Sequence, residues 1–285
     1  MLFDKLTPLL PICIPVVGSL VFFLVEIRAA DHAFLQRDML YLEFSELKKH
    51  PNGQVSQAFI VHLPEGGTPA ATVLYMENQD PVVYTEPIVN GTFTIRMSQY
   101  SRIRLFVLAG KKDALYLAHT HLVLFGKSGT TAHRTPASPS LADRLASLPR
   151  ISLESAEQYY WHQTGVPLGF TIKNAGIPDP GLTVFENGRI TPLVPDSPDP
   201  HRFTYTPPHD ERLKKAGYAA ARHDIVFTRF SLGRHRYHLS YVLHLHRSRY
   251  AHDNHRAGAA VLGAGLFGFT VLVLYKRRKR QWWNA

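Results

Sequence analysis

Histidine is the residue whose number and spacing in this chain most suggest chemistry. The 285 residues include 16 histidines, and a neutral imidazole is the commonest metal ligand in proteins. His119 and His121 stand two residues apart, and His244 and His246 repeat that spacing. Side chains at positions i and i+2 of a strand lie on one face, so each pair can reach one metal ion. The sequence therefore nominates His119 with His121 first, and His244 with His246 second, as metal ligands.

His32 is a third candidate, and its role depends on processing of the N-terminus. Cleavage after Ala29 would leave a chain that begins Ala30-Asp31-His32. A terminal amine, two backbone nitrogens and a third-position imidazole form a square-planar set that suits Cu(II) or Ni(II). The predicted cofactor is thus a transition metal ion, nickel, cobalt or copper, with the alternative that His32 binds nothing.

A structural role for the histidine pairs is the alternative to metal binding. In the predicted strand 236–246 the odd positions are apolar, so His238, His244 and His246 are expected to face away from the core. A polar strand face needs polar side chains even where no ligand binds. Neither pair has a nearby Asp, Glu or Cys at the spacing that would complete a zinc tetrahedron.

Known catalytic motifs do not occur in the sequence. There is no GxSxG turn, no P-loop, no dinucleotide-binding glycine pattern and no HExxH helix. His209 and His223 each precede an aspartate that could polarise the imidazole. Asp210 is instead interpreted as the cap of a helix that follows two prolines, and for His223 with Asp224 the alternative is a turn before the strand 225–230. We therefore expect a protein that is not an enzyme and has no catalytic residues.

The elements that would position the histidines are strands. Residues 31–126 and 151–249 contain short apolar or alternating runs separated by turns such as Asn90-Gly91 and Asn187-Gly188, a pattern typical of β-sandwiches. Between them, residues 127–150 are rich in Ser, Thr, Pro and Ala, which indicates a linker. The predicted fold class is all-β, with two tandem immunoglobulin-like sandwich domains at residues 30–126 and 151–250 joined by the linker 127–150.

Both ends of the chain carry apolar segments. Residues 9–25 are apolar and follow Lys5, which predicts a signal sequence over residues 1–29, or an uncleaved anchor in its place. Residues 257–275 carry no charge and are followed by five consecutive basic residues, 276–280. A helix of that length spans a bilayer, and the basic residues belong on its cytoplasmic side. We expect a single-pass protein of the cell membrane, with a periplasmic or other extracytoplasmic body and a cytoplasmic tail at residues 276–285.

The predicted membrane helix also indicates a partner. Ala260, Ala264 and Gly268 recur every four residues, and small residues in that register let a second helix approach closely. The expected partners are the lipid bilayer and another membrane protein. Nucleic acid is excluded, because half of the net charge of +10 comes from the basic residues 276–280.

The strand fragments Phe93-Thr94-Ile95 and Phe203-Thr204-Tyr205-Thr206-Pro207, together with the terminal segments, carry a family resemblance. Over about residues 31–250 the chain resembles the periplasmic immunoglobulin-like accessory components of bacterial nickel and cobalt uptake systems. That resemblance implies a binding or accessory protein that handles a transition metal beside a membrane transporter. Members of such families often begin the mature chain with a histidine, whereas His32 is not terminal. The alternatives are a structural or assembly subunit of a membrane complex without metal and, third, a hydrolase or redox enzyme.

Overall fold

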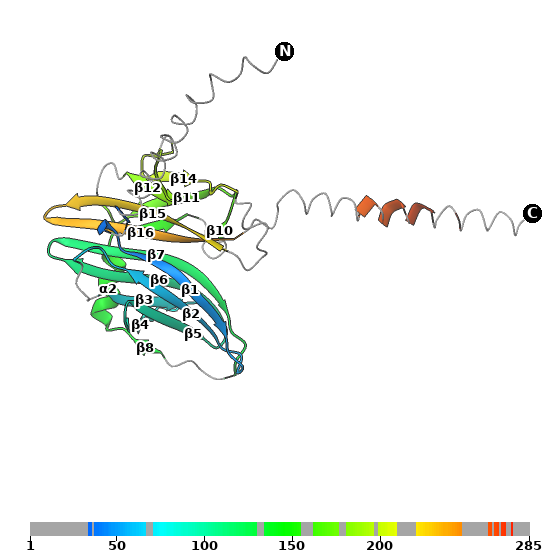
Figure 1. The fold of residues 1–285 in the computed structure, drawn as a ribbon, viewed down its shortest axis with the longest axis horizontal. Coiled ribbons are helices and arrows are strands. Elements are labelled where there is room, and N and C mark those ends of the chain that lie inside the picture. Colours follow the sequence, from blue (N-terminus) through cyan, green and yellow to red (C-terminus); the bar gives the residue numbers. More distant parts are fainter. Residues whose placement is uncertain are drawn as a thin grey trace, which may run out of the picture.

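The computed structural model describes residues 34–35, 37–66, 71–129, 134–154, 162–176, 181–196, 199–209 and 221–246, and from the C-terminal segment residues 262–263, 265–267, 269–271 and 275. Most of these residues lie in strands, which confirms the predicted all-β sandwich class. The strands form one long central sheet and two three-stranded sheets, which cover it on opposite faces (Figure 1).

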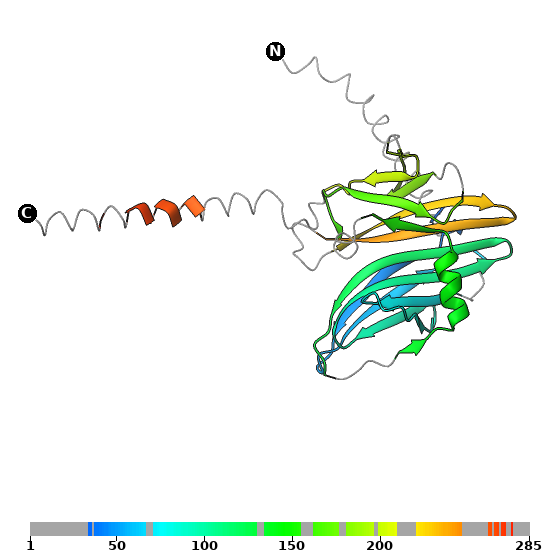
Figure 2. The ribbon, with the colours of Figure 1, turned by 180° about the vertical axis from the view of Figure 1, so that it is seen from behind.

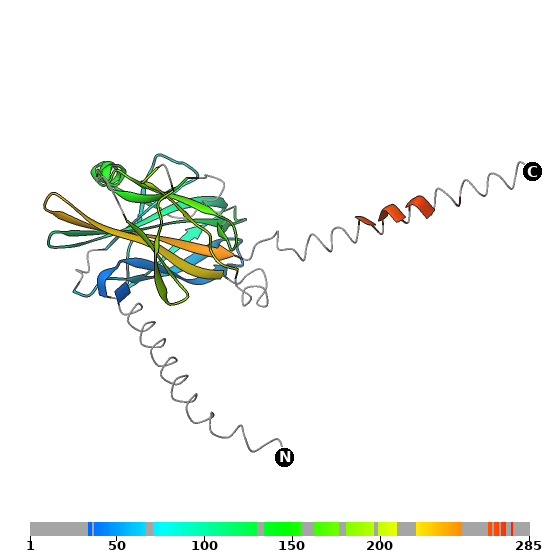
Figure 3. The ribbon, with the colours of Figure 1, turned by 90° about the horizontal axis from the view of Figure 1, so that it is seen from above.

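The central sheet contains strands from both halves of the chain. Its order is β13 (Arg189–Leu193), β12 (Leu182–Glu186), β15 (Ala221–Leu232), β16 (His235–His246), β7 (Ala114–Phe125), β6 (Tyr100–Lys111), β3 (Thr72–Glu77), β4 (Tyr84–Glu86) and β8 (Thr135–Pro136). Neighbours are antiparallel, except that β16 runs parallel to β7 and to the short β10 (His162–Gln163). The β15–β16 hairpin therefore lies beside the β6–β7 hairpin, with both turns at the same end (Figures 1 and 3).

The first outer sheet consists of β1 (Tyr41–Lys49), β2 (Val55–His62) and β5 (Thr92–Met97). It packs on the odd positions of β6, such as Leu105, to form the first core. β5 shows the alternation expected of an outer layer, because Phe93 and Ile95 are buried whereas Thr92 and Thr94 are exposed.

The second outer sheet consists of β14 (Arg202–Tyr205), β11 (Leu168–Lys173) and β9 (Arg150–Leu153). It packs on the other face of the central sheet, where Phe106 and Tyr241 join the second core. Helix α2 (Pro139–Ser147) extends this layer (Figure 2). Its Leu145 is buried in the second core. Pro139 suits the first position of the helix, because an N–H there has no partner within the helix.

Strand β16 lies in the middle layer and is buried on both sides. Its odd positions face the second core, as the sequence predicts, but the even-numbered Val242 is buried in the first core. The prediction that His238 and His244 face away from the core is therefore wrong. Both are half-buried, and His238 stacks on Tyr116 with ring centroids 4.5 Å apart.

The predicted linker contributes to the body of the protein. Within residues 127–150, Thr135–Pro136 forms strand β8 and Pro139–Ser147 forms helix α2. Because β16 pairs with β7, hydrogen bonding also continues between the two predicted domains. The domain boundaries themselves stay a prediction.

Several predicted features fall outside the part of the chain that the structure describes. These are the signal segment 1–29, His32, the small residues Ala260, Ala264 and Gly268, and the tail 276–285. The described residues between 262 and 275 are helical and their side chains are exposed, with Phe267 at 74%. Within the described ranges, no helix is both long and apolar enough to cross a membrane.

Candidate functional site

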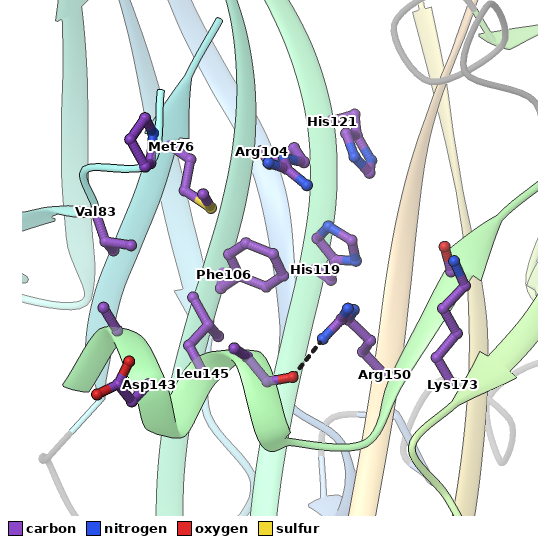
Figure 4. Close-up of a pocket in the computed structure, with 14 residues that line it drawn as sticks. Met76, Val83, Arg104, Phe106, His119, His121, Asp143, Leu145, Arg150 and Lys173 are labelled. Atoms are coloured by element: carbon purple, nitrogen blue, oxygen red, sulfur yellow. Dashed lines mark hydrogen bonds between the residues drawn. The ribbon is translucent and has the colours of Figure 1, made fainter. Parts of the chain in front are cut away.

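A cavity of about 440 Å³ lies between helix α2, the second outer sheet and the central sheet. Its walls come from β3, β6 and β7 of the central sheet, from β9 and β11, and from α2 (Figure 4). We call it the α2 cavity. It brings together segments that are up to about a hundred positions apart in sequence, from Met76 to Lys173.

His119 and His121 line the α2 cavity together. They occupy alternate positions of β7 and so point to the same face, with ring centroids 4.7 Å apart. Each is only 3% exposed, so both imidazoles belong to the interior of the protein. The structure thus brings the first predicted pair together. The pair lies in the core, and not on the solvated strand face that the sequence left open as an alternative.

His119 has a defined tautomer and a buried nitrogen. Its Nδ1 lies 3.2 Å from the carbonyl oxygen of Ile151. A carbonyl can only accept, so Nδ1 carries the hydrogen and Nε2 keeps its lone pair. Nε2 is buried and has no hydrogen-bond partner among the described residues. The ring also stacks on Phe106, with centroids 4.3 Å apart.

Burial keeps both imidazoles uncharged. It lowers the pKa of His119 to about 3, and the charges of Arg150 and Arg104 act in the same direction, while the Ile151 carbonyl opposes them. Burial also holds the pKa of His121 well below its usual value, with His119 next in importance. His121 is oriented by a 2.7 Å hydrogen bond between its Nδ1 and the hydroxyl of Tyr241.

Three cations line the same cavity. Arg104 comes from β6, Arg150 from β9 and Lys173 from β11, whereas Asp143 of α2 is the one carboxylate among the described residues of the wall. Among the described residues, none of the three cations forms an ion pair with a carboxylate. Arg150 donates a 3.1 Å hydrogen bond to the carbonyl of Ala146, and burial followed by the charge of Arg104 lowers its pKa. The cavity therefore has an excess of positive charge.

The second predicted histidine pair is arranged differently. His244 Nδ1 lies 2.8 Å from Nε2 of His223 on the neighbouring strand, so each imidazole already has an imidazole partner. The ring of His244 also packs on Phe44, with centroids 4.3 Å apart. The side chain of His246 lies outside the described residues. Within the described ranges, no group of three or more His, Cys, Asp or Glu side chains gathers in a way that could hold a metal ion.

A second buried polar cluster surrounds Asp224. A turn is one of two interpretations that the sequence leaves open for His223 and Asp224. Both lie inside β15, because pairing with β16 extends this strand from Ala221 to Leu232. Asp224 accepts hydrogen bonds from Tyr205 Oη at 2.6 Å and from Arg222 Nη2 at 2.8 Å, and Tyr205 also contacts Glu186. Burial raises the pKa of Asp224 although its bonds to Arg222 and Tyr205 lower it.

The sequence did not reveal the cations of the α2 cavity. Arg104 alternates with Arg102 at the start of β6, before the apolar run that begins at Leu105, and such alternation is typical of a solvated strand face. Arg150 and Lys173 stand at strand ends, where charged residues are common. Only the pairing of β9 with β11, and the packing of both on the central sheet, brings the three charges to one cavity.

No family model and no curated protein matches this chain. Solved structures that resemble it include a region of a 1.5-MDa bacterial ice-binding adhesin, at 10% identity and a TM-score of 0.26, over 74% of this chain and 67% of the other. The ectodomain of mouse nectin-like molecule 4 (Ig1–Ig3) gives 13% identity and a TM-score of 0.21, over 75% and 66%. Immunoglobulin domains 1–5 of Sidekick-1 give 10% and 0.21, over 73% and 40%. Scores this low carry no conclusion about shared topology or function.

Proposed function

We propose that this protein is a membrane-anchored binding protein that works outside the cytoplasm, with the α2 cavity as its ligand site. The observation that carries the proposal is the cavity itself. Its volume falls within the range of small-molecule sites, about 300–1,000 Å³, and it combines apolar walls with a few converging polar groups. Strands and one helix hold these groups, so the site is largely formed before a ligand arrives.

Binding without chemistry fits the hydrogen bonds in the cavity wall. Ser152 donates its hydroxyl hydrogen to the Leu153 carbonyl, at 3.3 Å, and His119 donates to Ile151. A nucleophile needs a base within hydrogen-bond reach, and the hydroxyl of Ser152 donates to the Leu153 carbonyl and not to an imidazole. The wall therefore supports a binding role over hydrolysis.

The anchor is proposed from residues 257–275. This uncharged segment is long enough for the hydrocarbon core of a bilayer, and the basic residues 276–280 would stay in the cytoplasm. The exposed apolar side chains at the described helical positions, such as Leu266 and Phe267, need an apolar environment. Ala260, Ala264 and Gly268 would let a second membrane protein pack against the helix, as an accessory protein of a transporter requires.

Membrane extraction tests the anchor. The full-length protein should remain in the membrane pellet after a carbonate wash, and a variant that ends at Arg256 should be released. External protease on spheroplasts should digest the body and leave a small C-terminal fragment. Release of the full-length protein by carbonate, or protection of the body from protease, would refute the proposed topology.

Transition-metal handling, with nickel, cobalt or copper, is the second candidate for the same site. His119 favours it, because a ligating imidazole usually donates its other N–H to a carbonyl, as Nδ1 does to Ile151. Metal analysis of the purified full-length protein, compared with a His119→Ala/His121→Ala variant, tests this role. The matched control is His201→Ala/His235→Ala, which removes two histidines outside the cavity. Equal metal content in all three proteins rules out the metal role.

A further inference from the structure

We propose that the α2 cavity binds an amphipathic organic anion, meaning a carboxylate joined to an apolar body. The inference rests on the proposed function, because it takes the cavity as the ligand site and names the class of ligand. It follows from the two kinds of side chain that line the cavity, cationic and apolar.

Three cations line the cavity: Arg150 and Lys173 extend from one side, and Arg104 lies on the central sheet near Phe106 and His121 (Figure 4). Among the described lining residues, Asp143 is the one carboxylate that opposes these three cations. The guanidinium of Arg150 has five N–H donors, and its hydrogen bond to Ala146 uses one of them. Guanidinium groups recognise carboxylates with paired, charge-assisted hydrogen bonds, which makes this side suited to a carboxylate.

The apolar side is formed by Met76, Val83, Phe106 and Leu145. Figure 4 shows these four side chains together on one side of the cavity, while Arg150 and Lys173 extend from the other. Val83, Phe106 and Leu145 are almost fully buried, so they present a fixed apolar surface. A small inorganic anion would leave this surface without a partner, whereas an apolar body attached to the carboxylate would cover it.

His119 leaves one acceptor nitrogen in the wall that the carboxylate of the ligand does not fill. Its Nε2 is a buried acceptor without a partner among the described residues. Buried polar atoms are nearly always hydrogen-bonded, and exceptions often mark a missing ligand or water. An ionised carboxylate offers only acceptor oxygens, so Nε2 requires a hydrogen-bond donor, such as a hydroxyl group on the body of the ligand or a water, and the carboxylate belongs at the three cations instead.

Calorimetric titration of the full-length protein in detergent tests the ligand class with three organic probes. 3-Phenylpropanoate carries both the charge and the apolar body, 3-phenylpropan-1-ol lacks the charge, and acetate lacks the body. The dissociation constant for 3-phenylpropanoate should be at least about tenfold lower than for either of the others. This expectation follows from a charge-assisted hydrogen bond, which is worth roughly a factor of ten or more. Equal affinity for the alcohol or for acetate would overturn the proposal.

Variants locate the binding in the cavity. Arg104→Gln and, separately, Lys173→Gln should each raise the dissociation constant for 3-phenylpropanoate about tenfold. Arg96→Gln removes an exposed arginine of β5, on the first outer sheet, and should leave the constant unchanged. Lys173 is exposed, so its variant gives an answer even where Arg104→Gln perturbs folding. Unchanged affinity in a folded Lys173→Gln protein would contradict the proposed site.

A nickel titration separates failure of this inference from failure of the proposed function. If nickel binds through His119 and His121 and 3-phenylpropanoate does not bind, the anion proposal is wrong and the cavity is still a ligand site. If neither probe binds, both the anion proposal and the binding function are wrong.

Discussion

Replacing His119 by glutamine should make folding less sensitive to acid. Burial holds the pKa of this imidazole at about 3 in the folded state, against 6.5 for an unperturbed histidine. A lowered pKa means that the folded state excludes the proton which the unfolded chain binds. The contribution of neutral His119 to the free energy of unfolding is therefore complete above pH 6.5 and is lost progressively as the pH falls toward 3.

The expected size follows from the width of that pH window. Each pH unit below 6.5 costs the wild-type protein roughly 1.4 kcal/mol in the free energy of unfolding. Between pH 7.5 and pH 4.5 the loss from this one group is about 2.7 kcal/mol. Glutamine cannot bind the proton, so His119→Gln should lose that much less over the same interval.

Urea unfolding of the full-length protein, followed by circular dichroism at four pH values from 7.5 to 4.5, measures the effect. Any pH-independent cost of the substitution lowers the free energy of unfolding of the variant equally at every pH. The informative quantity is therefore how the difference in this free energy between wild type and variant changes with pH. His235→Gln, at an exposed histidine, controls for removal of an imidazole and should follow the wild type. A wild-type to His119→Gln difference that stays constant with pH would refute the account of His119 as a buried neutral group.

Three further substitutions test other parts of the structure. Asp224→Asn should gain thermal stability relative to wild type as the pH rises from 4 to 7. The raised pKa of the Asp224 carboxyl stabilises the folded wild-type protein at low pH, and this contribution is lost as the carboxyl ionises. Melting curves in which the variant loses stability relative to wild type over this range would contradict the dominance of burial. Phe170→Ala, at a fully buried ring of the second core, should lower the free energy of unfolding in urea by about 3–5 kcal/mol, and a cost below about 1 kcal/mol would mean that this core is loosely packed. Gly126→Ala would place a methyl group 2.6 Å from the Met97 carbonyl oxygen and should lower the free energy of unfolding by about 1–3 kcal/mol. The control is Gly110→Ala, whose methyl group meets nothing within 4 Å. Equal stability of the two variants would refute the close approach at Gly126.

The histidine pair on β7 shows how far local reasoning reaches. The two-residue period of a strand correctly predicts that His119 and His121 share a face, because the period is a property of the backbone itself. The burial of both imidazoles could not be predicted, since it depends on Ile151 and on helix α2, which follow β7 in sequence and cover it only after folding.

Strand β16 shows where the same reasoning fails. Its alternation of apolar residues with histidines is typical of a sheet with one solvated face, yet Val242 on the polar face is fully buried in the first core. The difference arises because β16 occupies the middle of three layers. Nothing in the residues of β16 itself indicates that β1 will pack over that face.

The sequence by itself determined the strand-rich class, the turn at Asn187-Gly188, where both residues have the positive φ that an Asn-Gly pair adopts easily, and the shared face of His119 and His121. These features are local, and the conformational preferences of a few neighbouring residues decide them. The tertiary structure alone decided that β16 pairs in parallel with β7, that the central sheet is covered on both faces, and that Arg104, Arg150 and Lys173 meet at one cavity. Such features join residues far apart in the chain, and the free energy that selects them comes from burying surfaces that exist only once the layers have packed.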